Sequence, residues 1–169
     1  MFASDVLPSC IAFISEALKI PSLRSTRIPE ELAIRKRFDL IVVLSLFSHL
    51  PERTFSRWLR RIASLAAPGG LVILTTHGRV SAQHFGNPTL TAEGFWHSPQ
   101  SEHHELDRTH YGLSLCTREY CEACIAEIWD VKLVDYREGF WWGHQDVFVL
   151  RKERAQTPLE RVRKVFGSR

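Results

Sequence analysis

Two side chains in the first third of the chain, Asp5 and His49, are of types that bind or activate hydroxyl groups. Asp5 ends a short apolar segment, and a carboxylate at the tip of a strand can accept two hydrogen bonds from vicinal hydroxyls. Histidine titrates near neutral pH, so His49 could take a proton from a hydroxyl. Both also have a structural interpretation, because Asp5 could cap a helix that begins near Pro8 and His49 could brace the turn before Pro51.

The spacing of Cys121 and Cys124 is that of a metal-binding or redox pair. A zinc site would need two further ligands, which Cys116 and a histidine among residues 103–110 could supply. Both cysteines, however, fall on the apolar face of a helix expected after Thr117, where cysteine acts as a small hydrophobe. The sequence therefore favours a packed helix face and predicts no metal site.

Residues 77–116 are polar, rich in histidine and without a sustained period. A stretch of this length within a domain is usually functional, for example a lid. Aromatic residues interleaved with the polar ones would give a pocket apolar walls. We therefore expect a lid over a substrate, with His110 as a second candidate base; the alternative is a solvated loop. Near the other end, His144 and Gln145 could face the same pocket.

The elements that must position these residues alternate between strand-like and helix-like segments, which favours an α/β domain with a mainly parallel sheet. Residues 38–44 are continuously apolar, as in a strand covered on both faces. An amphipathic helix follows Pro51, and Pro68-Gly69-Gly70 is expected to end it before a strand at 71–76. Residues 131–137 and 146–150 predict an antiparallel hairpin.

Composition indicates an ordinary globular protein, with 169 residues, 44% of them hydrophobic, and a formal net charge of +3. Residues 153–169 form a basic tail, whose charge is too local to imply nucleic acid, and salt-dependent binding through it is a minor alternative. No signal peptide or membrane-spanning segment is visible, so we expect a cytoplasmic protein with reduced thiols.

The order of these elements resembles the class I S-adenosylmethionine-dependent methyltransferases. The resemblance covers residues 1–152, which we take as one domain with its lid-like insertion at 77–116. It is carried by the strand at 38–44, the following Ser-Leu-Phe-Ser-His-Leu-Pro, the helix, Pro-Gly-Gly and a strand, and by the closing hairpin. A nicotinamide-binding α/β domain would also suit Asp5, but the terminal hairpin favours the methyltransferases.

The resemblance implies roles for several residues at one crevice. Asp5 would bind the ribose of S-adenosylmethionine, Ser25 and Thr26 would lie near its adenosine, and Ser45 and Leu46 near its methionine end. His49 would face the substrate as the catalytic base, with His110 as the alternative from the lid. The acceptor would be a small molecule or a glycan, with a hydroxylated compound such as a sugar favoured by the polar lid.

The glycine-rich strand and loop that open this fold are lacking, because the first glycine of the chain is Gly69. In the resembled fold that first strand lies between two others, so two strand edges would be left unpaired and prone to self-association. We therefore expect an amino-terminally truncated domain with weak or absent cofactor binding on its own. The alternative function is a non-catalytic, degenerate interaction module.

Overall fold

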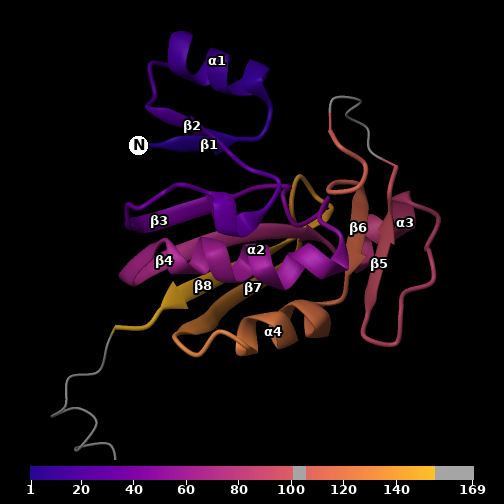
Figure 1. Ribbon diagram of the computed structural model, residues 1–169. Coiled ribbons are helices and arrows are strands. Elements are labelled where there is room, and N and C mark those ends of the chain that lie inside the picture. The colour runs from indigo at the N-terminus through magenta and orange to yellow at the C-terminus, as the bar shows by residue number, and fades with distance from the viewer. Residues whose placement is uncertain (101–105, 155–169) are drawn as a thin grey trace, which may run out of the picture.

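A computed structural model of the protein describes residues 1–100 and 106–154. Its amino-terminal unit is a two-stranded parallel sheet crossed by one helix, and it stands apart from the larger sheet, as Figure 1 shows. The elements of this unit are β1 (Ala3–Asp5), α1 (Pro8–Glu16) and β2 (Ser22–Arg24). A 3-10 turn, η1 (Pro29–Glu31), leads from the unit into the rest of the chain.

The larger sheet has four strands in the order β3-β4-β8-β7. They are β3 (Phe38–Val43), β4 (Ala66–His77), β7 (Val131–Trp141) and β8 (Gln145–Lys152). β3 and β4 pair in parallel, whereas β8 is antiparallel to both of its neighbours. The antiparallel hairpin expected near the carboxyl end is therefore confirmed, while the mainly parallel character expected for the sheet is not: the sheet is mixed.

One face of this sheet is covered by α2 (Glu52–Ser64) and α4 (Arg118–Ala126). The apolar stripe expected on the first helix is buried there through Phe55, Trp58, Leu59 and Ile62. Val72 and Leu74 of β4 and Phe148 and Leu150 of β8 meet it from the sheet. This periodicity places the hydrophobic core between the helices and one sheet face.

The opposite face of the sheet is open along β3. Leu40, Val42 and Leu44 are 54%, 52% and 42% exposed, although the sequence predicted a strand covered on both faces. That prediction was wrong because no described helix packs over β3 on this side, so alternate residues of this apolar strand are left in solvent. Among the described residues, β3 is also an edge strand, since β1 and β2 form a sheet of their own.

The Pro-Gly-Gly segment lies inside a strand instead of separating a helix from one. α2 ends at Ser64, and β4 begins at Ala66 and passes through Gly69 and Gly70. The pairing with β3 is irregular here, and Gly69 has a φ of +85°. A Cβ on Gly70 would lie 2.9 Å from the carbonyl oxygen of Phe38, so glycine permits this close approach.

The expected lid region, residues 77–116, contains a short helix and a hairpin-like pair of strands. These are α3 (Arg79–His84), β5 (Phe95–Ser98) and β6 (Leu113–Cys116), with β5 and β6 antiparallel. The side chains of Phe95, Tyr111 and Leu115 are buried, which ties this region to the body of the protein. Residues 101–105 of the expected lid, and 155–169 of the basic tail, lie outside the described residues.

Within the two described stretches, no helix combines the length and the apolar composition that a membrane crossing requires.

Candidate functional site

A groove of about 530 Å³ separates the amino-terminal unit from the edge of the larger sheet. One wall is formed by β1 and the residues after it, and the other by β3 and the loop that follows it. Its volume lies within the roughly 300–1,000 Å³ of small-molecule pockets. Five residues singled out from the sequence line it: Asp5, Ser25, Ser45, Leu46 and His49.

Asp5 lies at the carboxyl end of β1, as predicted. Its Oδ1 accepts a hydrogen bond of 2.8 Å from the backbone N–H of Leu7, just before α1 begins at Pro8. The carboxylate thus supports the turn into the helix, which is the structural role considered from the sequence. The second oxygen, Oδ2, receives no protein hydrogen bond within the described residues and can accept one from a ligand.

Ser45 holds the loop after β3 in a left-handed conformation, with a φ of +59°. Three hydrogen bonds keep it there. Its N–H donates to Thr75 Oγ1 (2.8 Å), its carbonyl accepts from Ser48 Oγ (2.7 Å), and its hydroxyl lies 3.1 and 3.2 Å from the two amide atoms of Gln145. The turn therefore depends on β4, β8 and the loop itself.

The ring of His49 has a defined tautomer in its neutral form. Nδ1 lies 2.7 Å from the carbonyl oxygen of Gly112. Because a carbonyl only accepts hydrogen bonds, Nδ1 must carry the hydrogen, and the lone pair of the neutral ring is on Nε2. His49 is one of the residues that line the groove.

The loop that carries His49 is joined to β6 and the residues before it by backbone hydrogen bonds. Gly112 N donates to the carbonyl of His49, and Ser114 N donates to that of Ser48, both at 2.8 Å. The buried Ser114 hydroxyl also donates to Leu50 O at 2.6 Å. A Cβ on Gly112 would lie 2.0 Å from Ser98 O, so only glycine fits where this clamp is formed.

His77, at the end of β4, lies behind the groove and is only 5% exposed. Its Nδ1 donates to Ser114 O (3.2 Å), and its Nε2 faces Gln145 Nε2 at 3.3 Å across the β4–β8 pairing. Burial, followed by the nearby ring of His49, lowers the pKa of His77 to about 4. His77 is therefore neutral at physiological pH and accepts a hydrogen bond from the Gln145 amide.

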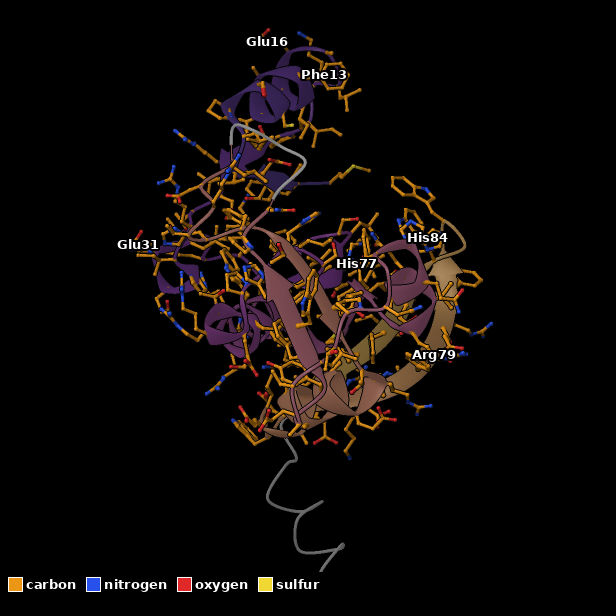
Figure 2. The ribbon with its side chains drawn as sticks, turned by 90° about the vertical axis from the view of Figure 1, so that its right-hand side faces the viewer. Phe13, Glu16, Glu31, His77, Arg79 and His84 are labelled. Atoms are coloured by element: carbon orange, nitrogen blue, oxygen red, sulfur yellow. The ribbon has the colours of Figure 1, made fainter. Side chains whose placement is uncertain are left out.

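Further histidines surround His77 on the side of α3. The ring of His144 lies 5.8 Å from that of His77 and 5.7 Å from that of His84. Figure 2 shows His77 and His84 close to each other in the body of the protein, below Phe13 of α1 in this view. No group of His, Cys, Asp or Glu side chains within residues 1–100 and 106–154 has an arrangement that could hold a metal ion.

Two predicted site residues do not line the groove. Thr26 Oγ1 donates to Ile28 O (2.7 Å), although its carbonyl accepts from the hydroxyl of Tyr111 (3.4 Å). His110 Nδ1 lies 2.8 Å from Thr109 Oγ1 and 3.5 Å from Asp107 Oδ2, outside the groove. Tyr111, the neighbour of His110, lines the groove instead.

Three of the four cysteines, Cys116, Cys121 and Cys124, belong to the core, whereas Cys10 is partly exposed on α1. Cys121 is fully buried and Cys124 nearly so, both packed with Ile125 on α4, and all four cysteines of the chain are free thiols. Burial raises the pKa of the Cys116 thiol to about 12, which makes it a poor nucleophile. The small-hydrophobe interpretation agrees with this packing.

Thr75 and His77 were missed as parts of the site. Gln145 was expected to face the pocket, whereas it is buried behind Ser45 and does not line the groove. No local signal identifies them, because their relation to Ser45 depends on the pairing of β4 with β8. His77 and Gln145 are paired residues in that ladder, 68 positions apart in sequence.

No family model matches the sequence, and no curated protein matches it. Solved structures do resemble the fold. An S-adenosylmethionine-dependent methyltransferase from Methanosarcina mazei superposes with a TM-score of 0.64 at 13% identity, covering 91% of this chain and 82% of its own. The N-methyltransferase NodS from Bradyrhizobium japonicum, in complex with S-adenosyl-L-homocysteine, superposes with a TM-score of 0.57 at 14% sequence identity, covering 89% of this chain.

This chain spans only 65% of the length of NodS. The [4+2]-cyclase SpnF gives a TM-score of 0.59 at 11% identity, covering 91% of this chain and 66% of SpnF. The same architecture therefore occurs in proteins described by different reactions. From the strands, the covering helices and these superpositions together, the chain has a methyltransferase-like α/β fold with a mixed sheet.

Proposed function

We propose that the chain is a methyltransferase domain that binds S-adenosylmethionine in the groove between β1 and β3. The observation that supports this most is that Asp5 and Ser45, on separate sheets and 40 positions apart, line one cavity at the carboxyl ends of their strands. Ligands of open α/β sheets bind at such ends.

The residues present suit the two polar ends of the cofactor. The unpaired carboxylate oxygen of Asp5 can accept from a ribose hydroxyl, and the hydroxyl of Ser45 can bind a charged amino-acid group. Apolar side chains such as Val6, Leu46 and Leu106 line the space between them. The backbone of a glycine loop is not among these contacts, so we expect these residues alone to bind the cofactor weakly.

A bound sulfonium cofactor supplies an electrophilic methyl group. The protein's part is to hold the acceptor in line and, where that acceptor carries a proton, to remove it. His49 Nε2 has the free lone pair for this step, and the Gly112 carbonyl fixes the ring and stabilises the imidazolium that forms. A hydroxylated small molecule or glycan is the acceptor class we propose, with His49 as its base.

The second candidate is a degenerate domain without catalysis, and the open face of β3 favours it as a surface for another chain. Cofactor binding distinguishes the two functions. An interaction module does not need a carboxylate and a serine hydroxyl that line the same groove.

The direct test is saturation-transfer NMR with S-adenosylhomocysteine at millimolar concentration, a method that detects weak binding. For the parent chain we expect a dissociation constant above the micromolar range. For Asp5→Ala we expect the affinity to fall at least tenfold. Asp135→Ala, in β7 outside the groove lining, is the matched control and should bind as the parent does. Absence of any saturation transfer, or equal binding by the Asp5 variant, would refute the proposal.

A further inference from the structure

Gln145 opens β8 directly opposite His77 at the end of β4, and it is 4% exposed. Its amide reaches across β4 to the Ser45 hydroxyl beyond β3, with Oε1 at 3.2 Å and Nε2 at 3.1 Å from Oγ. A buried amide satisfied by two side chains on two other segments is held in one orientation.

The orientation of this amide is set by His77. Because His77 Nδ1 donates to the carbonyl of Ser114, its Nε2 carries a lone pair and can only accept. The atom of Gln145 at 3.3 Å from it must therefore be the NH₂ group. One backbone carbonyl thus fixes the histidine tautomer, and the tautomer fixes which end of the amide faces it.

The consequence reaches the groove through Ser45. Its left-handed φ of +59° is unfavourable for a residue with a Cβ, so the turn needs side-chain support. Gln145 provides that support from the interior, while Thr75 provides it from the neighbouring strand. Ser45 Oγ accepts from the amide NH₂ and donates to the amide Oε1. When an anionic ligand enters the groove, the NH₂ can keep its hydrogen bond to Oγ while the hydroxyl hydrogen turns from Oε1 to the ligand.

We propose that Gln145, oriented by His77, is a positioning residue that fixes the turn and the hydroxyl direction of Ser45 for an anionic group bound in the groove. The ligand part of this inference rests on the proposed function, since the probe is the carboxylate-bearing S-adenosylhomocysteine. The structural part, which concerns only the conformation of Ser45, is independent of the proposed function.

The test compares Gln145→Leu with Tyr136→Phe in the full chain. Tyr136→Phe removes a 2.8 Å hydrogen bond to Asp146 in the same hairpin without touching Ser45, so it controls for general loosening. The readout is the N–H to Hα scalar coupling and the carbon shifts of Ser45, which report a left-handed backbone. We expect Gln145→Leu to abolish that signature and Tyr136→Phe to retain it.

The cofactor readout adds a double-mutant comparison. Gln145→Leu and Ser45→Ala should each weaken S-adenosylhomocysteine binding at least fivefold, and the double variant should be no weaker than Ser45→Ala alone. Independent, additive losses would overturn the inference, as would an unchanged Ser45 signature in Gln145→Leu. If the signature depends on Gln145 but the parent chain binds no cofactor, the positioning role stands and the proposed function fails.

Gln145→Glu serves if the leucine variant does not fold. A carboxylate cannot donate to His77 Nε2, so that nitrogen is expected to gain a proton, visible as loss of its unprotonated ¹⁵N resonance, with a change at Ser45. Unchanged His77 and Ser45 resonances in this variant would overturn the inference.

Discussion

Acid should destabilise this protein through one buried ring, that of His77. Burial lowers the pKa of His77 from its ordinary 6.5 to about 4, so the unfolded chain binds this proton at a pH where the folded chain does not. The contribution of the neutral ring to the free energy of unfolding is complete above pH 6.5 and is lost as the pH falls to about 4. The loss amounts to about 3 kcal/mol.

The perturbation is His77→Gln, which keeps a polar side chain and removes the titration. Urea unfolding is followed by tryptophan fluorescence between pH 7 and pH 4, and the free energy of unfolding is extrapolated to zero urea. Other groups titrate in this range, among them His97, whose pKa burial lowers, and Asp146, whose pKa burial raises. Their contributions are the same in both proteins, so they cancel when the free energy of unfolding of the variant is subtracted from that of the parent.

We expect this difference to shrink by about 3 kcal/mol from pH 7 to pH 4. Thr54→Ala is the control, because it deletes a buried hydroxyl bound to the backbone carbonyl of Pro51 (3.0 Å) and removes no titrating group. Its cost should be the same at every pH. A difference for His77→Gln that is equally independent of pH would refute the assignment of acid sensitivity to this ring.

Two further predictions concern the loop clamp and the open face. Gly112→Ala should lower the free energy of unfolding by about 1–3 kcal/mol, seen as a lower melting temperature, because its Cβ would collide with Ser98 O. Gly86→Ala meets no atom within 4 Å, so it carries only the backbone strain of its φ of +74° and should cost less; equal losses would contradict the clash. Val42→Lys should reduce the concentration-dependent self-association seen in sedimentation velocity, because it places a charge on an open edge strand. Trp129→Lys, at a turn residue that is 84% exposed, should leave self-association unchanged. A parent chain that stays monomeric, or self-association that persists in Val42→Lys, would contradict this prediction.

Local patterns were sufficient for most elements of the fold. Pro8 begins α1, Thr117 caps α4 by accepting from Tyr120 N (3.1 Å), and the stripe of α2 faces the core. These signals act within a few residues, so they survive in any tertiary setting. The exposure of Leu40 could not be predicted from the strand, because an apolar run does not reveal whether a covering element is present.

The candidate site was predictable only where it sits directly after a strand. Asp5, Ser45 and His49 follow strand ends, and the carboxyl ends of neighbouring strands converge, so their common groove could be anticipated. The tautomer of His49 and the contact between His77 and Gln145 depend on registers between distant segments. A sequence pattern cannot fix such registers, since a shift of one residue turns every side chain to the other face.

The position of Asp5 depends on few contacts, and this bears on how the proposed site would work. None of the residues of α1 is buried, so the helix adds little packing to the amino-terminal unit. The unit contacts the rest through Val6, which packs against the core, and the Phe2–Phe38 ring stack (5.9 Å). The residues after β2 add the exposed Arg27–Asp107 ion pair (3.0 Å) and the long hydrogen bond from Tyr111 to Thr26 O. An exposed ion pair adds at most about 1 kcal/mol.

A ligand that joins Asp5 to Ser45 would therefore do more than fill the groove. It would link a lightly held unit to a loop whose turn is fastened at three points, and the restraint would fall mainly on the side of Asp5. Binding to the folded state alone raises stability by mass action. Hydrogen exchange should accordingly slow in β1 and β2 on adding S-adenosylhomocysteine, with little change in the loop after β3, which the protein already holds.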